Sequence, residues 1–154
     1  MPIARLLDRE RVALVDAPLD HADVIARAAE LLARPVGGHG LAAGELAARL
    51  AERERLASTG LGHGVAIPHG RLGTLDQPRA AFLRLATPVD FQAPDGRPVD
   101  LVFAMVVPEQ AVAGHLAHLA EIAERFSDAG FRNALREADD ARELATLLLR
   151  GEAA

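Results

Sequence analysis

A continuous apolar run near the middle of the chain, Leu101-Val102-Phe103-Ala104-Met105-Val106-Val107, constrains the fold more than any other stretch. A strand that faces water on one side alternates apolar with polar residues, whereas a strand covered on both faces is apolar throughout. Pro108 ends the run because proline cannot donate a hydrogen bond to a sheet ladder. We therefore predict a central strand over 99–107 that is buried on both faces.

Helical and strand patterns alternate around this run. Pro94-Asp95-Gly96 is a turn signal that predicts a hairpin between 89–91 and 99–107. Further strands are predicted over 12–15, 65–67 and 80–86. Helical spacing of apolar residues predicts helices over 3–8, 21–34 with Asp20 as N-cap, 41–56, 110–127, 131–138 and 141–149. The predicted fold class is α/β: a mixed β-sheet of about five strands flanked by helices, in a single domain over 1–154.

The composition excludes several classes of function. The chain has no cysteine, which excludes a disulfide framework and thiolate chemistry. It is mildly acidic with a net charge of −5, lacks tyrosine and tryptophan, and has dispersed arginines and no lysine, so we expect no nucleic-acid partner. No apolar run approaches the roughly 18–20 residues that cross a bilayer. We expect no membrane insertion, no secretory signal and a cytoplasmic location.

The segment from Ser58 to Arg71 is the strongest local signal for chemistry. Its glycines let the backbone approach a ligand, and the exposed amides of such a loop can bind an anion. His69 lies between Pro68 and Gly70, where a fixed imidazole is well placed to attack or carry a phosphoryl group. The alternative is that the glycines only make turns and His69 caps a strand, because glycine-rich loops are common.

Two histidines follow on the helix predicted over 110–127. At 100° per residue, His115 lies at the border of the apolar stripe and is predicted to face the sheet. His118 lies further round and is predicted to face water. His115 is either a histidine at the edge of the core or a part of the site, and helical geometry alone does not pair it with His69.

A metal site is the competing interpretation of these histidines. His63 and His69 are six residues apart, and the two helix histidines are three apart, but no HExxH motif occurs. We therefore predict no metal and no cofactor. His21 and His39 are predicted to be solvated residues near helix ends, and the arginines at 49, 53 and 55 match an ordinary charged helix face.

Residues Arg53–Arg71, with the sequence RERLASTGLGHGVAIPHGR, closely resemble the active-site signature of the fructose/mannitol-type IIA proteins of the bacterial phosphotransferase system. Within that family the chain is similar to the nitrogen-related regulatory branch. Further matching stretches follow in the same order, namely Pro88–Phe91, Asp95-Gly96, Pro98–Ala104, Val107-Pro108 and His115-Leu116. The resemblance covers nearly the whole chain, and it favours the chemical interpretation of His69.

The resemblance implies a role for each matching residue. His69 would be the phosphorylated residue, which accepts phosphate from an HPr-like carrier of the nitrogen-related type. His115 would support the phosphoryl group by hydrogen bonding, and Arg53 would neutralise its charge. Support of the phosphate site is implied for the small residues of the signature, Ser58, Thr59 and Gly70. Two positions depart from the family pattern: His63 stands where asparagine is usual, and Ala57 stands where glycine is common.

The implied function is a phosphoryl carrier of the nitrogen-related relay that forms a covalent phosphohistidine and regulates target proteins, rather than a stand-alone turnover enzyme. By resemblance, those targets include potassium-transport or sensor-kinase proteins. One alternative is a sugar-transport IIA component that passes phosphate to a separate IIB domain. A second alternative is an interaction module that is not phosphorylated.

Overall fold

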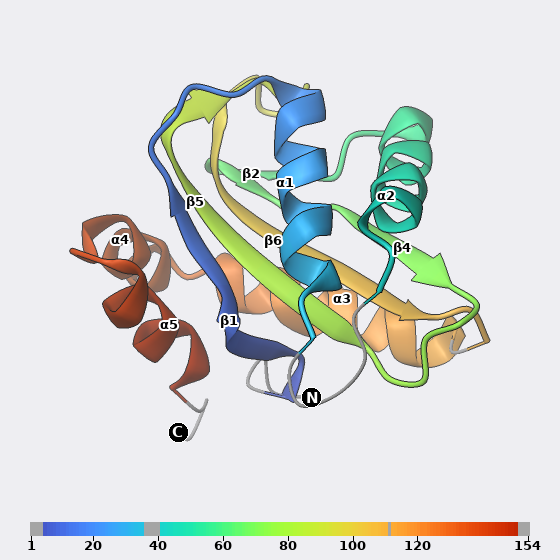
Figure 1. The fold of residues 1–154 in the computed structure, drawn as a ribbon. Helices are drawn as coiled ribbons and strands as arrows, with labels where there is room; N and C mark the ends of the chain where they lie inside the picture. Colours follow the sequence, from blue (N-terminus) through green and yellow to red (C-terminus); the bar gives the residue numbers. More distant parts are fainter. Residues whose placement is uncertain (1–4, 36–40, 111, 151–154) are drawn as a thin grey trace.

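The computed structural model describes residues 5–35, 41–110 and 112–150, without the side chains of 112–116. Within these residues, six strands form one mixed sheet with five helices on its two faces (Figure 1). The strands are β1 (Leu7–Val15), β2 (Gly60–Gly62), β3 (Val65–Ala66), β4 (His69–Leu72), β5 (Arg79–Val89) and β6 (Val99–Pro108). The helices are α1 (His21–Ala33), α2 (Ala43–Leu56), α3 (Val112–Phe126), α4 (Ala129–Glu137) and α5 (Ala141–Leu149).

The apolar strand predicted over 99–107 is β6, and it lies at the centre of the sheet. The strand order is β1-β5-β6-β3-β2, and β4 also pairs with β6. β5 and β6 form the predicted antiparallel hairpin, with a register that brings Phe82 opposite Phe103 and Val89 opposite Val99. β3 and β4 both run parallel to β6 along its other edge.

Side chains of β6 alternate between two cores. Leu101, Phe103 and Met105 pack in the core beneath α3, α4 and α5. Val102 and Ala104 pack in the core beneath α1 and α2, on the opposite face of the sheet. Both faces are covered, which explains why the strand carries no polar residue between these positions.

β3 and β4 are two halves of one strand edge that is interrupted at Ile67-Pro68. β3 pairs Val65 with Leu101, and β4 resumes the ladder with His69 opposite Met105. Pro68 has no N–H to give, but its carbonyl accepts the N–H of Met105 at 2.9 Å. The parallel ladder therefore fixes the backbone on both sides of His69.

The predicted helices and strands are largely confirmed, with three corrections, of which the first is that β4 (His69–Leu72) was not predicted. The helix expected over 3–8 is wrong, because residues from Leu7 onward belong to β1, which pairs in parallel with β5. β1 is an edge strand of the sheet, and its register with β5 shifts between Leu7 and Val12. Because of this irregularity, residues 7–12 do not show the regular apolar alternation by which a strand is predicted. The glycine-rich stretch from Gly60 to Gly62, expected as loop, is the short strand β2.

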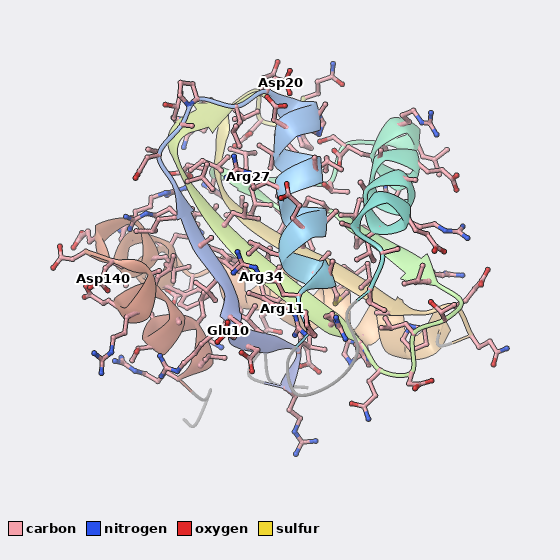
Figure 2. All side chains as sticks on the ribbon, in the orientation of Figure 1. Glu10, Arg11, Asp20, Arg27, Arg34 and Asp140 are labelled. Carbon is pink, nitrogen blue, oxygen red and sulfur yellow. The ribbon has the colours of Figure 1, made fainter. Side chains whose placement is uncertain are left out.

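The N-cap of α1 is confirmed, and its C-terminus is held by arginines. Asp20 accepts the N–H of Asp23 and forms a full capping box. At the other end, Arg11 Nη2 donates to the carbonyl of Arg34 at 2.9 Å, and Arg79 Nη1 donates to that of Leu32 at 2.9 Å. Figure 2 shows Arg11 and Arg34 close together where α1 meets β1. Cations at a helix C-terminus satisfy its last carbonyls and favour the helix dipole.

Arg84 closes the C-terminus of α4 in the same way. Its Nη1 donates to the carbonyls of Leu135 at 2.8 Å and Ala138 at 2.7 Å, with a longer contact to that of Arg136 at 3.2 Å. Arg84 reaches these groups from β5, so one guanidinium joins the sheet to α4.

We predict that Arg84→Met lowers the free energy of unfolding by about 1–3 kcal/mol, because partly buried carbonyls lose a charged donor. Urea unfolding followed by circular dichroism measures the change. Arg27→Met, on an exposed position of α1, is the matched control and is expected to change stability by less than about 0.5 kcal/mol. Equal stabilities of the two variants would contradict the role assigned to Arg84.

Candidate functional site

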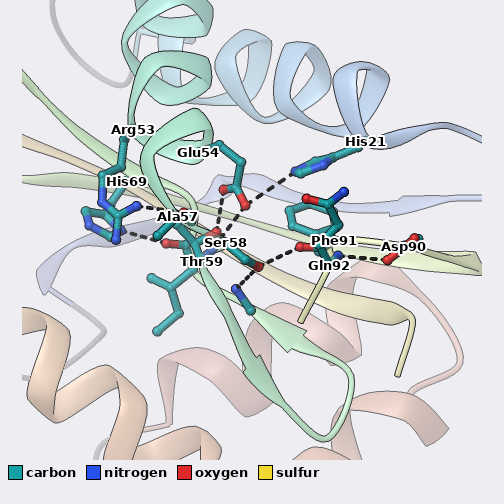
Figure 3. A network of polar contacts seen from close by, with 12 residues as sticks. His21, Arg53, Glu54, Ala57, Ser58, Thr59, His69, Asp90, Phe91 and Gln92 are labelled. Atoms are coloured by element: carbon teal, nitrogen blue, oxygen red, sulfur yellow. Dashed lines mark hydrogen bonds and ion pairs between the residues drawn. The ribbon is translucent and has the colours of Figure 1, made fainter. Parts of the chain in front are cut away.

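His69 is the first residue of β4, and its half-buried ring is oriented by the backbone (Figure 3). The ring Nδ1 lies 2.8 Å from the carbonyl oxygen of Ile67. A carbonyl oxygen only accepts, so Nδ1 carries the proton of this hydrogen bond. In the neutral ring, the lone pair is then on Nε2.

The surroundings of His69 favour its neutral form. Burial lowers its pKa below the ordinary value of 6.5, and the cations Arg53 and Arg71 lower it further. The hydrogen bond to Ile67 and the charge of Glu54 oppose this shift without reversing it. At neutral pH the ring is therefore uncharged and nucleophilic at Nε2.

His69 lines an open cavity of about 620 Å³ between α2, β4 and α3. Three arginines line the same cavity, Arg49, Arg53 and Arg71, together with Glu52 and Glu109. At its edge lies Leu56, whose exposed fraction of 81% is the largest of any bulky apolar side chain in the described part of the chain. The cavity thus combines a neutral imidazole with a local excess of positive charge.

Arg53 is held by the loop that follows α2. Its Nη1 donates to the carbonyl of Ala57 at 2.8 Å, which satisfies an acceptor at the C-terminus of the helix. Because Arg53 also lines the cavity of His69, the predicted pair of His69 and Arg53 is brought together at one site.

The side chains of the two predicted hydroxyl residues make hydrogen bonds within the protein. Ser58 Oγ donates to the carbonyl of Phe91 at 2.6 Å and accepts the N–H of Gly60 at 3.0 Å. Thr59 is 6% exposed and donates both its N–H and its hydroxyl to the carboxylate of Glu54. A hydroxyl has one hydrogen to donate, so in this structure both side chains brace the loop.

Gly70 allows β4 to pack closely against α2. A Cβ at this position would lie 3.4 Å from both the backbone oxygen and the Cβ of Arg49. The glycine after His69 therefore serves close packing, in addition to clearing space beside the ring.

The helix histidines differ from their predicted placement. His115 lies on α3, but its side chain is outside the described residues, as is the whole of His39. His118 was predicted to face water, and this is wrong: it is 8% exposed. A projection of α3 alone does not include its neighbours, and α3 packs against α4 as well as the sheet, with the rings of Phe126 and Phe131 5.2 Å apart.

His63 is not among the residues that line the cavity, and its contacts with the rest of the protein are made by its backbone. Its φ is +58°, its N–H donates to Asp95 Oδ2 at 2.8 Å, and its carbonyl accepts Arg136 Nη2 at 2.6 Å. Arg136 is also paired with Asp100 at 2.9 Å. Asparagine is among the residues that tolerate positive φ best, so the backbone at this position suits asparagine as well as histidine.

Sequence analysis missed Glu54, whose side chain is 7% exposed. It lies on the helix that carries the arginines at 49, 53 and 55, but it accepts two hydrogen bonds from Thr59 and lies 3.5 Å from His21 Nε2. His21, expected to be solvated, packs at a tilt against Phe91, with ring centroids 4.0 Å apart. Helical spacing could not reveal these contacts, because Thr59 lies beyond the end of α2.

No cluster of three His, Asp or Glu side chains in the described ranges is placed to hold a metal ion. In the same part of the chain, no helix is long and apolar enough to cross a membrane.

Comparison with known proteins agrees with this fold. The family model for the EIIA 2 component of the phosphoenolpyruvate-dependent sugar phosphotransferase system matches residues 5–151. The chain belongs to this family. A nitrogen regulatory protein of Bradyrhizobium diazoefficiens is 40% identical over 141 residues, which cover 82% of this chain and 92% of that protein. Within the family the chain is therefore similar to nitrogen regulatory proteins.

Two further comparisons support the same placement. A nitrogen regulatory protein of Pseudomonas aeruginosa is 50% identical over 95 residues, which span 62% of each chain. The crystal structure of the nitrogen regulatory protein IIA-Ntr from Neisseria meningitidis has a TM-score of 0.84 at 37% identity, covering 95% of this chain and 98% of that one.

We predict that His63→Val unfolds at a lower urea concentration than His63→Asn, with a difference in stability of about 1–2 kcal/mol. A β-branched residue is poorly accommodated at positive φ, whereas asparagine tolerates it. Both variants lack the imidazole, so any effect of losing the ring on stability is the same in both and does not contribute to their difference. Equal midpoints would contradict the assignment of strain to the backbone.

Proposed function

We propose that this chain is a phosphoryl carrier that accepts phosphate on His69 Nε2 from an HPr-like carrier and regulates target proteins by its phosphorylation state. The observation that carries the proposal is the hydrogen bond from His69 Nδ1 to the Ile67 carbonyl. It leaves the lone pair on Nε2 in a ring that lines an arginine-rich cavity. A neutral, oriented imidazole beside cations is the arrangement that phosphoryl transfer needs.

The transfer is an exchange between two histidines. The Nε2 lone pair forms the new P–N bond while the P–N bond to the imidazole of the carrier breaks and its electron pair returns to that ring. The Nδ1 proton stays on His69, where the Ile67 carbonyl stabilises the charge that develops on the ring. Bond energies on the two sides are nearly equal, so the step needs positioning and charge stabilisation rather than a metal.

Arg53 has the clearest supporting role in this step. It lines the cavity and is held by the Ala57 carbonyl, so its charge is available to the oxygens of the transferring group at little cost in side-chain entropy. His115 is proposed, from the family pattern, as the second histidine that hydrogen-bonds the phosphoryl group.

The regulatory role and the partners are proposed from the relatives and from the surface. The nitrogen regulatory relatives favour a carrier of the nitrogen-related relay over one dedicated to sugar uptake. The exposed Leu56 beside the cavity offers an apolar contact for an HPr-like protein. The second candidate function is a sugar-transport IIA, which the family description itself favours.

We predict that the protein takes up acid-labile phosphate when it is incubated with phosphoenolpyruvate, enzyme I and an HPr-type carrier, and that His69→Ala takes up none. His63→Asn is the matched control, because it removes a histidine outside the cavity and is expected to label as fully as wild type. Labelling of His69→Ala to the same extent, or none of wild type, would contradict the proposal.

The same labelled protein separates regulation from transport. Mixed with isolated fructose- or mannitol-type IIB domains, it is expected to pass on little or no phosphate. Rapid and complete transfer to a IIB domain would favour the sugar-transport function instead.

We predict that the rate of phosphate acceptance declines as pH falls, with a midpoint below the ordinary histidine pKa of 6.5. The neutral ring is the nucleophile, and burial lowers its pKa, so protonation begins at a lower pH than in a free histidine. NMR titration of the His69 ring checks this independently of the carrier. Arg53→Gln is expected to raise the His69 pKa, and an unchanged or lowered value would contradict the model.

A further inference from the structure

The geometry points to Glu54 as a positioning residue for the phosphoryl acceptor: its buried carboxylate fixes the loop whose backbone orients both His69 and Arg53. The inference deepens the proposed function and rests on it for its effect on phosphate transfer. The effect on the orientation of the His69 ring stands on the structure alone.

The first step is the contact between Glu54 and Thr59. Glu54 lies in the last turn of α2, and each of its carboxylate oxygens receives one hydrogen bond from Thr59. The backbone N–H donates to Oε2 at 3.0 Å, and the hydroxyl donates to Oε1 at 2.6 Å. Two charge-assisted bonds to one residue fix both its backbone and its rotamer (Figure 3).

The second step runs from Thr59 to the ring of His69. The Thr59 carbonyl accepts the N–H of Ile67 at 3.0 Å, and the Ile67 carbonyl is the acceptor for His69 Nδ1 at 2.8 Å. Glu54, Thr59, Ile67 and His69 therefore form a continuous path of hydrogen bonds. A displacement of Thr59 moves the carbonyl that selects the tautomer of the ring.

The same loop also holds Arg53. The Ala57 carbonyl, two residues before Thr59, accepts Arg53 Nη1 at 2.8 Å. Arg53 and Glu54 are consecutive on α2, so their side chains leave the helix about 100° apart. Arg53 reaches the cavity, whereas Glu54 reaches the loop behind it. Both side chains are bonded to the same short segment, Ala57–Thr59.

The carboxylate of Glu54 also contacts His21, which in turn packs on Phe91. His21 Nε2 lies 3.5 Å from Glu54 Oε2, and its ring packs at a tilt against Phe91. The Phe91 carbonyl accepts the hydroxyl of Ser58, which braces the residue next to Thr59. A carboxylate screened from water in this way has a stronger effect on its hydrogen-bond partners than an exposed one.

The experiment compares Glu54→Gln with wild type and with Glu30→Gln, a control that removes a carboxylate from an exposed position of α1. Glutamine keeps the length of the side chain but has an NH2 donor in place of one carboxylate oxygen, so one of the two Thr59 donors meets a donor instead of an acceptor. We expect the maximal rate of phosphate acceptance to fall about 10- to 100-fold, the size typical of losing an orienting partner. The KM for the carrier is expected to stay unchanged.

The second readout is the tautomer of His69, followed by nitrogen chemical shifts of the ring. We expect Glu54→Gln to increase the share of the ring protonated on Nε2 and to lower the His69 pKa, whereas Glu30→Gln changes neither. The inference is overturned if Glu54→Gln leaves both the ring shifts and the maximal rate unchanged, or if it alters only KM.

Two further variants keep the test decisive if Glu54→Gln does not fold. Thr59→Val removes the hydroxyl and keeps the shape, and it is expected to shift the ring in the same direction by a smaller amount. Thr59→Ser keeps the hydroxyl and is expected to restore the wild-type tautomer. If wild type accepts no phosphate but the ring shifts as described, the proposed function fails and the positioning role stands.

Discussion

The parallel ladder between β6 and the broken edge β3–β4 is the constraint on which the site depends. β6 is buried on both faces, so it cannot shift without exposing one of two cores. Pro68 interrupts the edge and still accepts from Met105, which places His69 at the point where the ladder resumes. The acceptor for the ring, the Ile67 carbonyl, belongs to the same interruption. His69, the proposed phosphoryl acceptor, is thus positioned by the backbone of the sheet, and side chains line only the cavity through which a phosphoryl group would reach it.

The C-terminus of α2 positions Arg53 and the loop that follows it, which are the other parts of the site. Its C-terminal residue is followed by Ala57 in an extended conformation rather than by a glycine, so its last carbonyls need donors from elsewhere. Arg53 is one such donor, and the turn that it closes carries Ser58 and Thr59 into hydrogen bonds with Phe91 and Glu54. In a chain without lysine, arginine closes helix ends repeatedly, and at α2 this structural task coincides with the chemical one. The planar guanidinium can serve the carbonyl and still present charge to the cavity.

Sequence patterns of a few residues predicted the features that depend only on neighbouring residues in the chain. The buried strand, the hairpin and the N-cap at Asp20 follow from runs of a few residues, and His69 could be proposed from the sequence because its signature is contiguous. The burial of His118 and the contact of His21 with Glu54 depend on segments distant in the sequence, which no helical projection contains. His63 shows the same limit, since its positive φ is held by Asp95 and Arg136. The roles of single residues were therefore hardest to predict where a neighbour comes from another element.

The charges around the cavity suggest how a phosphorylation state at His69 would be read by another protein. Three arginines and two glutamates line the cavity, which leaves a small excess of positive charge beside the exposed Leu56. A phosphoryl group adds close to two negative charges, which is enough to reverse the local sign. A partner that docks on the apolar edge would then meet a cationic face before transfer and an anionic one after it. Because opposite charges at an interface favour binding and like charges suppress it, a phosphorylated donor would be attracted before transfer, and a second phosphorylated donor would be repelled after it. No change of fold is required for this selection, which is consistent with a ring held by the rigid centre of the sheet.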